Sequence, residues 1–403
     1  MGSILLVLIY VAFISLGLPD AALGSAWPSM YGEMGVPVSY AGVISMLIAG
    51  GTIVSSLFSV RVIRRFGTGV VTAVSVGMTA VALLGFSISR SFWHLCLWAI
   101  PYGLGAGSVD AALNNFVALH YKSRHMNWLH CFWGVGAAAG PFIMGLCLAG
   151  GLKWNSGYLS IGLIQVVLVA CLIFSIPLWK GSQPTDRRSE ETHTHYGMLE
   201  ILRMPGAKPL LVAFFCYCAV EVTAGLWASS YLVLFKGRAP EAAAKMASLI
   251  YLGITGGRFL SGLVSGKLGD RNMVRLGEAV AVAGLVFLLL PLGDVSLYAG
   301  LTLLGLGCAP IFPSLLHATP DNFGADRSQT IMGMQMAAAY TGSTLMPPVF
   351  GFLAARTGLW LYPAYLLVFG VGMVFLTERA NRLCARNRPT LTGVAPERKE
   401  EAL

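Results

Sequence analysis

Four strongly ionisable residues lie well inside long apolar stretches of the sequence: Asp20, Asp110, Glu221 and Arg258. Placing such a group in a bilayer costs about 2.5–3.5 kcal/mol on insertion scales, and these residues often mark substrate or proton pathways. Asn114 follows Asp110 by one helical turn, on the same face. Asp20 and Asp110 are therefore candidates for binding a proton or the hydroxyl groups of a solute. The alternative for either carboxylate is a structural hydrogen-bond network.

Glu221 and Arg258 in the second half of the chain admit two explanations. Glu221 binds a solute, or it forms an ion pair with Arg258 that lowers the cost of burying both charges. Because the uncharged solute that we favour needs no cation, we expect Arg258 to have a structural role.

Amide groups and aromatic rings in the same stretches suit a sugar-like solute. Amides and carboxylates hydrogen-bond to hydroxyl groups, and aromatic faces pack against the C–H surface of a sugar ring. His130, one turn before Trp133, is a candidate proton relay. The other candidates for solute or proton binding are Asn114, Asn115, Trp133, Trp227 and Gln335. For any single ring, packing in the core or in an interface belt is the alternative.

The composition indicates a helical protein that crosses a membrane several times. Of the 403 residues 56% are hydrophobic and only 11% are charged, and runs of about 20 apolar residues recur. The net charge of +9 is spread over short loops, so we expect no nucleic-acid partner. Seven of the eight cysteines lie in apolar runs without metal-ligand spacing, so we expect no disulfide framework, no metal and no cofactor.

Twelve spans are predicted, and one long polar loop divides them into six and six. We expect an N-terminal six-helix bundle over residues 1–180, a cytoplasmic central loop over 181–208, a C-terminal bundle over 209–380 and a cytoplasmic tail over 381–403. The first span is expected to be a retained helix and not a cleaved signal. The predicted spans are 4–30, 40–60, 68–88, 92–119, 127–150, 156–179, 209–233, 243–266, 274–292, 296–318, 328–353 and 358–378.

Lysine and arginine counts predict the orientation. One set of alternating loops, together with the C-terminal tail, holds 20 of these residues, and the opposite set holds six. Since cytoplasmic loops carry the excess of positive charge, both termini are expected in the cytoplasm.

The two halves also carry similar motifs in the same order, at offsets of 201 to 206 residues. This pattern predicts two parallel six-helix repeats around a central cavity. The matched motifs are Asp20 to Gly24 with Glu221 to Gly225, Gly50-Gly51 with Gly256-Gly257, Gly103-Leu104-Gly105 with Gly305-Leu306-Gly307, and Pro141 to Gly145 with Pro347 to Gly351.

The span count, the central loop and the repeat resemble the major facilitator superfamily. The run from Gly266 to Arg271 (GKLGDR) is similar to that superfamily's G-x-L-x-D-R loop between spans 8 and 9. The resemblance implies an all-α fold of twelve transmembrane helices in two bundles. A charged loop at a bundle end can lock one access state, which makes Gly266, Asp270 and Arg271, together with Arg258, candidates for structural or gating roles. Simple anchoring by positive charge is the alternative.

Within that superfamily the sequence is most similar to the fucose permease group of sugar:proton symporters. The similar segments are GLPDAALG (17–24), GLGAGSVD (103–110), LHCFWGVGAAAGP (129–141) and APIFPSL (309–315). The resemblance implies proton-coupled sugar uptake, with Asp20 and Asp110 at the positions of that group's functional acidic residues.

This resemblance also sets the remaining expectations. We expect a monomer in the cytoplasmic (inner) membrane, coupled to protons with sodium as the alternative ion. Proton-driven efflux of drugs or metabolites is the competing function, because GAAAGP (136–141) partly resembles the antiporter motif of span 5. The spans contain no paired catalytic motif, so an enzyme is not expected.

Overall fold

The structure is a computed structural model that describes residues 2–120, 123–180 and 198–391. Within these ranges every regular element is helical. The elements in chain order are α1 (Gly2–Asp20), α2 (Ala22–Glu33), η1 (Val38–Tyr40), α3 (Ala41–Phe66), α4 (Thr68–Ile88), α5 (Phe92–His120), α6 (Ser123–Ala149), α7 (Trp154–Lys180), α8 (Met198–Arg203), α9 (Ala207–Leu234), α10 (Pro240–Leu289), α11 (Asp294–His317), α12 (Thr319–Phe323), α13 (Ala325–Thr357), η2 (Leu359–Leu361) and α14 (Tyr362–Leu391).

Nine of the described segments are long and apolar enough to cross a bilayer. One of them, α10, covers two of the predicted spans. The helices α5 and α13 are 29 and 33 residues long but richer in small and polar residues, as expected for helices that face a polar interior and not lipid. The chain is therefore a multi-pass membrane protein with an all-α fold.

Two predicted boundaries differ from the structure. The first span is broken, because α1 ends at Asp20 and α2 begins at Ala22. Pro19 lacks a backbone N–H and clashes with the preceding turn, which favours a break at this place. The other difference is the end of the last span, because α14 continues to Leu391, beyond the predicted end of the bundle at residue 380. Between spans 8 and 9 the helix is interrupted at Gly269, as the predicted turn requires, and its φ of 70° is a conformation that glycine adopts readily. Most of the predicted central loop, residues 181–197, and the end of the tail, 392–403, lie outside the described residues.

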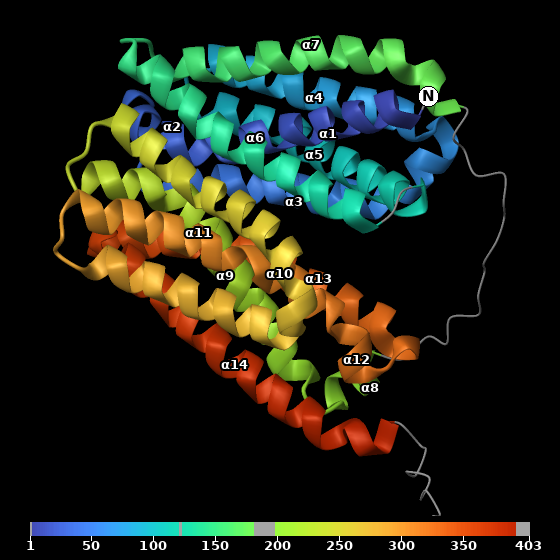
Figure 1. The fold of residues 1–403 in the computed structure, drawn as a ribbon. Helices are drawn as coiled ribbons and strands as arrows, with labels where there is room; N and C mark the ends of the chain where they lie inside the picture. Colours follow the sequence, from blue (N-terminus) through green and yellow to red (C-terminus); the bar gives the residue numbers. More distant parts are fainter. Residues whose placement is uncertain (1, 121–122, 181–197, 392–403) are drawn as a thin grey trace, which may run out of the picture.

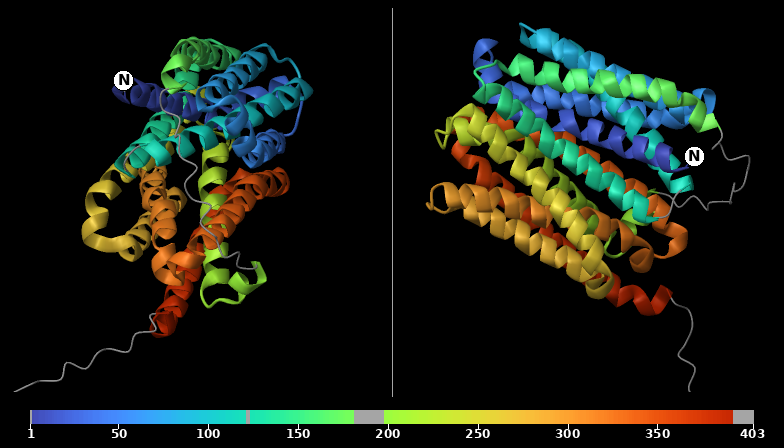
Figure 2. Two further views of the ribbon diagram at one scale, coloured as in Figure 1. Left: turned by 90° about the vertical axis from the view of Figure 1, so that its right-hand side faces the viewer. Right: turned by 45° about the horizontal axis from the view of Figure 1, so that its top comes forward.

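The helices form two groups that meet at one end of the molecule (Figure 1). Helices α1 to α7 form the first group and α9 to α14 the second, and the main contacts between them join α6 to α10, α2 to α9, and α3 to α13. The groups lie close together beside α2 and diverge toward the end that carries the N-terminus and α8 (Figures 1 and 2). One end is therefore closed and the other is splayed.

Small residues allow the closed end to pack backbone against backbone. Gly24 of α2 lies against the carbonyl oxygen of Gly225 in α9, and Gly42 of α3 lies against Pro348 of α13. Gly145 of α6 faces the start of α10. Close approach of this kind replaces the hydrophobic driving force that helices lack in lipid.

The internal repeat is visible in equivalent helix contacts. Gly103 of α5 packs against the carbonyl oxygen of Ile48, and Gly305 of α11 packs against that of Ile250. Gly305 follows Gly103 by 202 residues, and Ile250 follows Ile48 by the same number. Gly51 likewise faces Gly103, while Gly253 faces Gly305. The equivalent of Gly51 is thus Gly253, and the predicted match of Gly50-Gly51 with Gly256-Gly257 was wrong by one helical turn.

Gly103→Val is expected to destabilise the first helix group. A side chain there would collide with the backbone of Ile48, and overpacking of this kind costs about 1–3 kcal/mol or more. Gly50→Val is the matched control, because the space beside Gly50 is open. Thermal unfolding in detergent should show a clear loss of melting temperature for Gly103→Val alone. Equal melting temperatures for the two variants would contradict the packing described here.

Candidate functional site

The carboxylate of Asp20 is the acceptor at the centre of the candidate site. It receives a hydrogen bond from the hydroxyl group of Tyr102 at 2.9 Å and one from the indole N–H of Trp133 at 2.8 Å. Asp20 is exposed, although its neighbours Pro19 and Ala21 are buried. The break between α1 and α2 therefore presents this carboxylate to an accessible space between the helices.

Trp133 connects the two helix groups at this point. Its indole N–H binds Asp20 of the first group, while the guanidinium carbon of Arg258, from α10, lies 5.4 Å from the centre of its ring. Tyr251, also from α10, packs edge-on against the same ring, with 6.4 Å between ring centres. A cation over an indole face is held by the ring's quadrupole. Trp133 thus lies between a carboxylate of one half and a cation of the other.

Asp110 forms the second carboxylate position, on α5. It accepts a hydrogen bond of 2.9 Å from the side-chain amide of Asn114, and it lies close enough to Asp20 and to Tyr340 of α13 for their charges to interact. The carbonyl oxygen of Asn114 is buried and has no hydrogen-bond partner among the described residues. Asn115 is not among the residues whose side chains the structure describes.

The ion pair considered for Glu221 and Arg258 is not formed in this structure. Among the described residues no carboxylate oxygen lies within 4.0 Å of the Arg258 guanidinium group. Both residues are nevertheless near Tyr217 of α9, with which each interacts electrostatically. Arg258 instead reaches α6, where it donates to the backbone oxygen of His130 at 3.3 Å.

Three predicted residues occupy other surroundings. The ring of His130 packs edge-on against Phe13. Trp227 is fully buried at the closed end, and its indole N–H donates to the backbone oxygen of Pro347 at 3.0 Å. Gln335 is fully buried and accepts a hydrogen bond from Thr319 at 3.1 Å. Neither Trp227 nor Gln335 has a face accessible to a solute in this arrangement.

Sequence reasoning missed two tyrosines of the site. Tyr102 lies two helical turns before Asp110, and Tyr251 lies two turns before Arg258. Residues seven or eight positions apart share a helical face, so a search along the face of each charged residue would have found both.

The residues predicted to gate lie at the splayed end. Asp270 follows the bend at Gly269 and binds His317 of α11, with 2.7 Å between Oδ2 and Nδ1. Gly266 and Arg271 are exposed. In this arrangement Asp270 contacts its own helix group and not the first one.

Metal chemistry finds no support in the described part of the chain. There, no group of three or more His, Cys, Asp or Glu side chains could hold a metal ion. The candidate site consists of carboxylates, hydroxyl groups, an amide, aromatic rings and one guanidinium group. Side chains of these kinds can hydrogen-bond to a polar solute, and the carboxylates can take up a proton.

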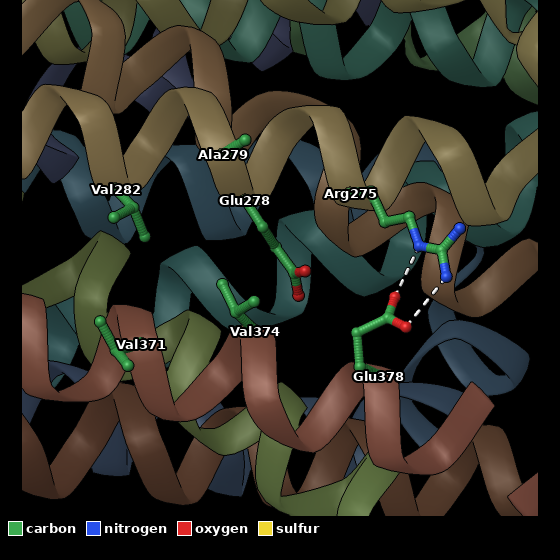
Figure 3. Close-up of a pocket in the computed structure, with 7 residues that line it drawn as sticks. All are labelled: Arg275, Glu278, Ala279, Val282, Val371, Val374 and Glu378. Carbon is green, nitrogen blue, oxygen red and sulfur yellow. Dashed lines mark hydrogen bonds and ion pairs between the residues drawn. The ribbon is translucent and has the colours of Figure 1, made fainter. Parts of the chain in front are cut away.

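A hollow of about 460 Å³ lies between α10 and α14, and Asp20 is not among the residues that line it (Figure 3). Arg275 and Glu378 close one side of it with two hydrogen bonds of 2.6 and 2.9 Å. Glu278 points into the hollow and is only 1% exposed. The hydroxyl group of Thr377 is near, but neither it nor the carboxyl group of Glu278 completes a hydrogen bond with proper geometry.

Glu278→Leu is expected to raise the melting temperature of the detergent-solubilised protein. A buried polar group without a partner costs about 1–3 kcal/mol, and the surrounding valines accept an apolar side chain. Glu378→Gln, which breaks only a partly exposed ion pair, is the control and should change stability by about 1 kcal/mol or less. A melting temperature of Glu278→Leu well below that of the control would mean that the carboxyl group has a stabilising partner.

Comparisons with known proteins agree with the fold and indicate a transporter. A sequence model of the Major Facilitator Superfamily matches residues 9–334 and 239–400. The crystal structure of a bacterial homologue of the human lysosomal transporter Spinster, in an inward-facing and occupied conformation, matches with a TM-score of 0.70 at 12% identity, over 98% of both chains.

Two curated relatives match most of the chain. Bypass of stop codon protein 6 of Saccharomyces cerevisiae is 23% identical over 88% of this chain and 77% of its own length. The cis,cis-muconate transport protein of Acinetobacter baylyi is 22% identical over 87% of this chain and 88% of its own length. With its fold and its sequence in agreement, the chain belongs to the Major Facilitator Superfamily of secondary transporters.

Proposed function

We propose that the protein is a proton-coupled symporter of a small polar solute, and that Asp20 and Asp110 carry the coupling. The observation behind this proposal is the Asp20 carboxylate, which is accessible at a helix break and bound by Tyr102 and Trp133. A proton on this carboxyl group weakens its bond to Trp133, because a neutral acceptor binds an N–H donor less strongly than a charged one. Protonation would thereby release the Trp133 ring, which lies against Arg258 and Tyr251 of the second group.

Transport would proceed by alternating access between two rigid halves, residues 1–180 and 209–380. The close contacts of α2 with α9 and of α3 with α13 hold one end shut. If both termini are cytoplasmic, as the loop charges predict, the splayed end faces the cytoplasm and the arrangement is the inward-open one. Sliding and rocking of packed helices is the usual way in which such halves exchange states.

A sugar is the first candidate for the solute. Carboxylates at Asp20 and Asp110, the amide of Asn114 and the face of Trp133 are the groups that recognise hydroxyls and a sugar ring. This composition also argues against the efflux of apolar drugs. The resemblance to the fucose permease group supports the same solute class, and the inner membrane, proton coupling in place of sodium, and a monomeric state belong to this proposal.

A small organic anion is the second candidate. Arg258 has no carboxylate partner among the described residues, and the relative named for muconate transport handles a dicarboxylate. The two candidates differ in whether Arg258 contacts the solute.

Uptake into proteoliposomes under an imposed inward proton gradient tests the coupling. Asp20→Asn and Asp110→Asn remove one titratable group each while keeping the side-chain size. We expect loss of gradient-driven accumulation in at least one of them, while exchange of labelled for unlabelled solute persists, since exchange needs no net proton movement.

Asp294→Asn is the matched control, because Asp294 is an exposed carboxylate at the closed end, paired with Arg238. It should accumulate solute like the wild type. Accumulation that survives in both Asp20→Asn and Asp110→Asn would exclude these carboxylates as proton carriers, and expulsion of cationic dyes without any uptake would favour the efflux function.

A further inference from the structure

No carboxylate oxygen of the described residues lies within 4.0 Å of the guanidinium group of Arg258 at the candidate site. Of its five N–H donors, one reaches the backbone oxygen of His130 at 3.3 Å. None of its nitrogens is both buried and unpartnered, so the remaining donors point to space that water reaches. An arginine inside a membrane protein normally pairs with an acidic group.

The position of Arg258 is fixed for binding. Its guanidinium carbon lies over the ring of Trp133, 5.4 Å from the ring centre, and the N–H of this ring is held by Asp20. A planar guanidinium group held on an aromatic face offers its paired N–H donors in a fixed geometry, which matches the two oxygens of a carboxylate. A lysine at this position would supply a charge without this fork.

Hydroxyl-binding groups lie on the first-half side of the same site. Asp20 is bonded to Trp133 and is close enough to Asp110 for their charges to interact. The side-chain amide N–H of Asn114 donates to Asp110, and its buried carbonyl oxygen has no donor among the described residues. A solute with a carboxylate on Arg258 would thus meet acceptors for its hydroxyl groups on α1 and α5.

We infer that the transported solute is a small carboxylate that also carries hydroxyl groups, with its carboxylate bound by Arg258. The inference rests on the proposed transport function and makes its solute an acid in place of a neutral sugar. It replaces the expectation that Arg258 has only a structural role.

The carboxyl groups of the site make binding of an anionic solute depend on their protonation. The carboxylates of Asp20, Asp110 and Glu221 repel an anion bound at Arg258. This repulsion between the anion and the carboxylates falls as they take up protons. Binding should therefore strengthen as the pH falls. The titratable and charged side chains around the site are Asp20 on α1, Tyr102 and Asp110 on α5, His130 and Cys131 on α6, Tyr217, Cys218 and Glu221 on α9, Tyr251 and Arg258 on α10, Cys308 on α11 and Tyr340 on α13.

Matched pairs of an acid and its amide provide the test. Binding of glucuronate and glucuronamide, and of 4-hydroxybenzoate and 4-hydroxybenzamide, is measured by calorimetry on the purified full-length protein. We expect at least one acid to bind, and to bind about tenfold or more tightly than its amide, since a charged bidentate pair is much stronger than a neutral contact. An amide or glucose that binds as tightly as the best acid would overturn the inference.

Variants of Arg258 locate the binding group. Arg258→Gln should abolish the preference for the acid, and Arg258→Lys should retain only part of it. Arg356→Gln is the matched control, because Arg356 also lies over an aromatic ring, that of Phe352 at 4.1 Å, but is exposed at the end of α13. An unchanged acid preference in Arg258→Gln would overturn the assignment of this residue.

Exchange in proteoliposomes separates this inference from the proposed function. If a neutral sugar exchanges equally well in the wild type and in Arg258→Gln, the protein is a transporter and the carboxylate inference fails. If an acid binds through Arg258 but no solute exchanges, the inference about binding stands and the transport proposal fails.

Discussion

The contact of Trp133 with Asp20 on one side and Arg258 on the other is the interaction on which the site depends. It places an indole ring between opposite charges of two helix groups that otherwise touch mainly at one end. A charged residue in a bilayer is tolerated when a partner or an accessible polar space reduces its cost. Here Asp20 obtains two donors, and Arg258 obtains a ring and one backbone oxygen. Each charge keeps part of its hydrogen-bonding capacity free, which is the property that a binding site needs.

In this structure the two halves are packed together at one end and splayed at the other. Glycines bring backbones together where α2 meets α9 and where α3 meets α13. Close backbone contacts between helices hold the two groups in one arrangement, and in our proposal the groups break these contacts when they change to the other access state. Within each half, by contrast, Gly103 and Gly305 lock equivalent helix pairs in the same way. The repeat therefore gives the two halves equivalent helix contacts, and in our proposal the groups between them bind the solute and the proton.

Much of the fold follows from the sequence, because length and hydropathy determine which segments cross a bilayer. The all-α fold was predictable for this reason, and the family was predictable from the span count, the repeat and the motif at residues 266–271. The break at Ala21 and the kink at Gly269 depend on backbone geometry that hydropathy does not report. The partners of Arg258 depend on which helices meet, and helix neighbours in a membrane are set by packing of small residues. That is why an ion pair with Glu221 was plausible from the sequence, while the structure places Arg258 on Trp133.

The central claim is that the two halves exchange a closed end for an open one around this contact. Distances between spin labels test it most directly, with one pair at Arg61 and Lys267 on the splayed end and another at Leu152 and Gly237 on the closed end, all four being exposed. Between neutral and acidic pH in nanodiscs, we expect a new population in which the first distance shortens while the second lengthens, and Asp20→Asn should hold one population at both pH values. Distances that never change in opposite directions, or that change equally in Asp20→Asn, would contradict the account.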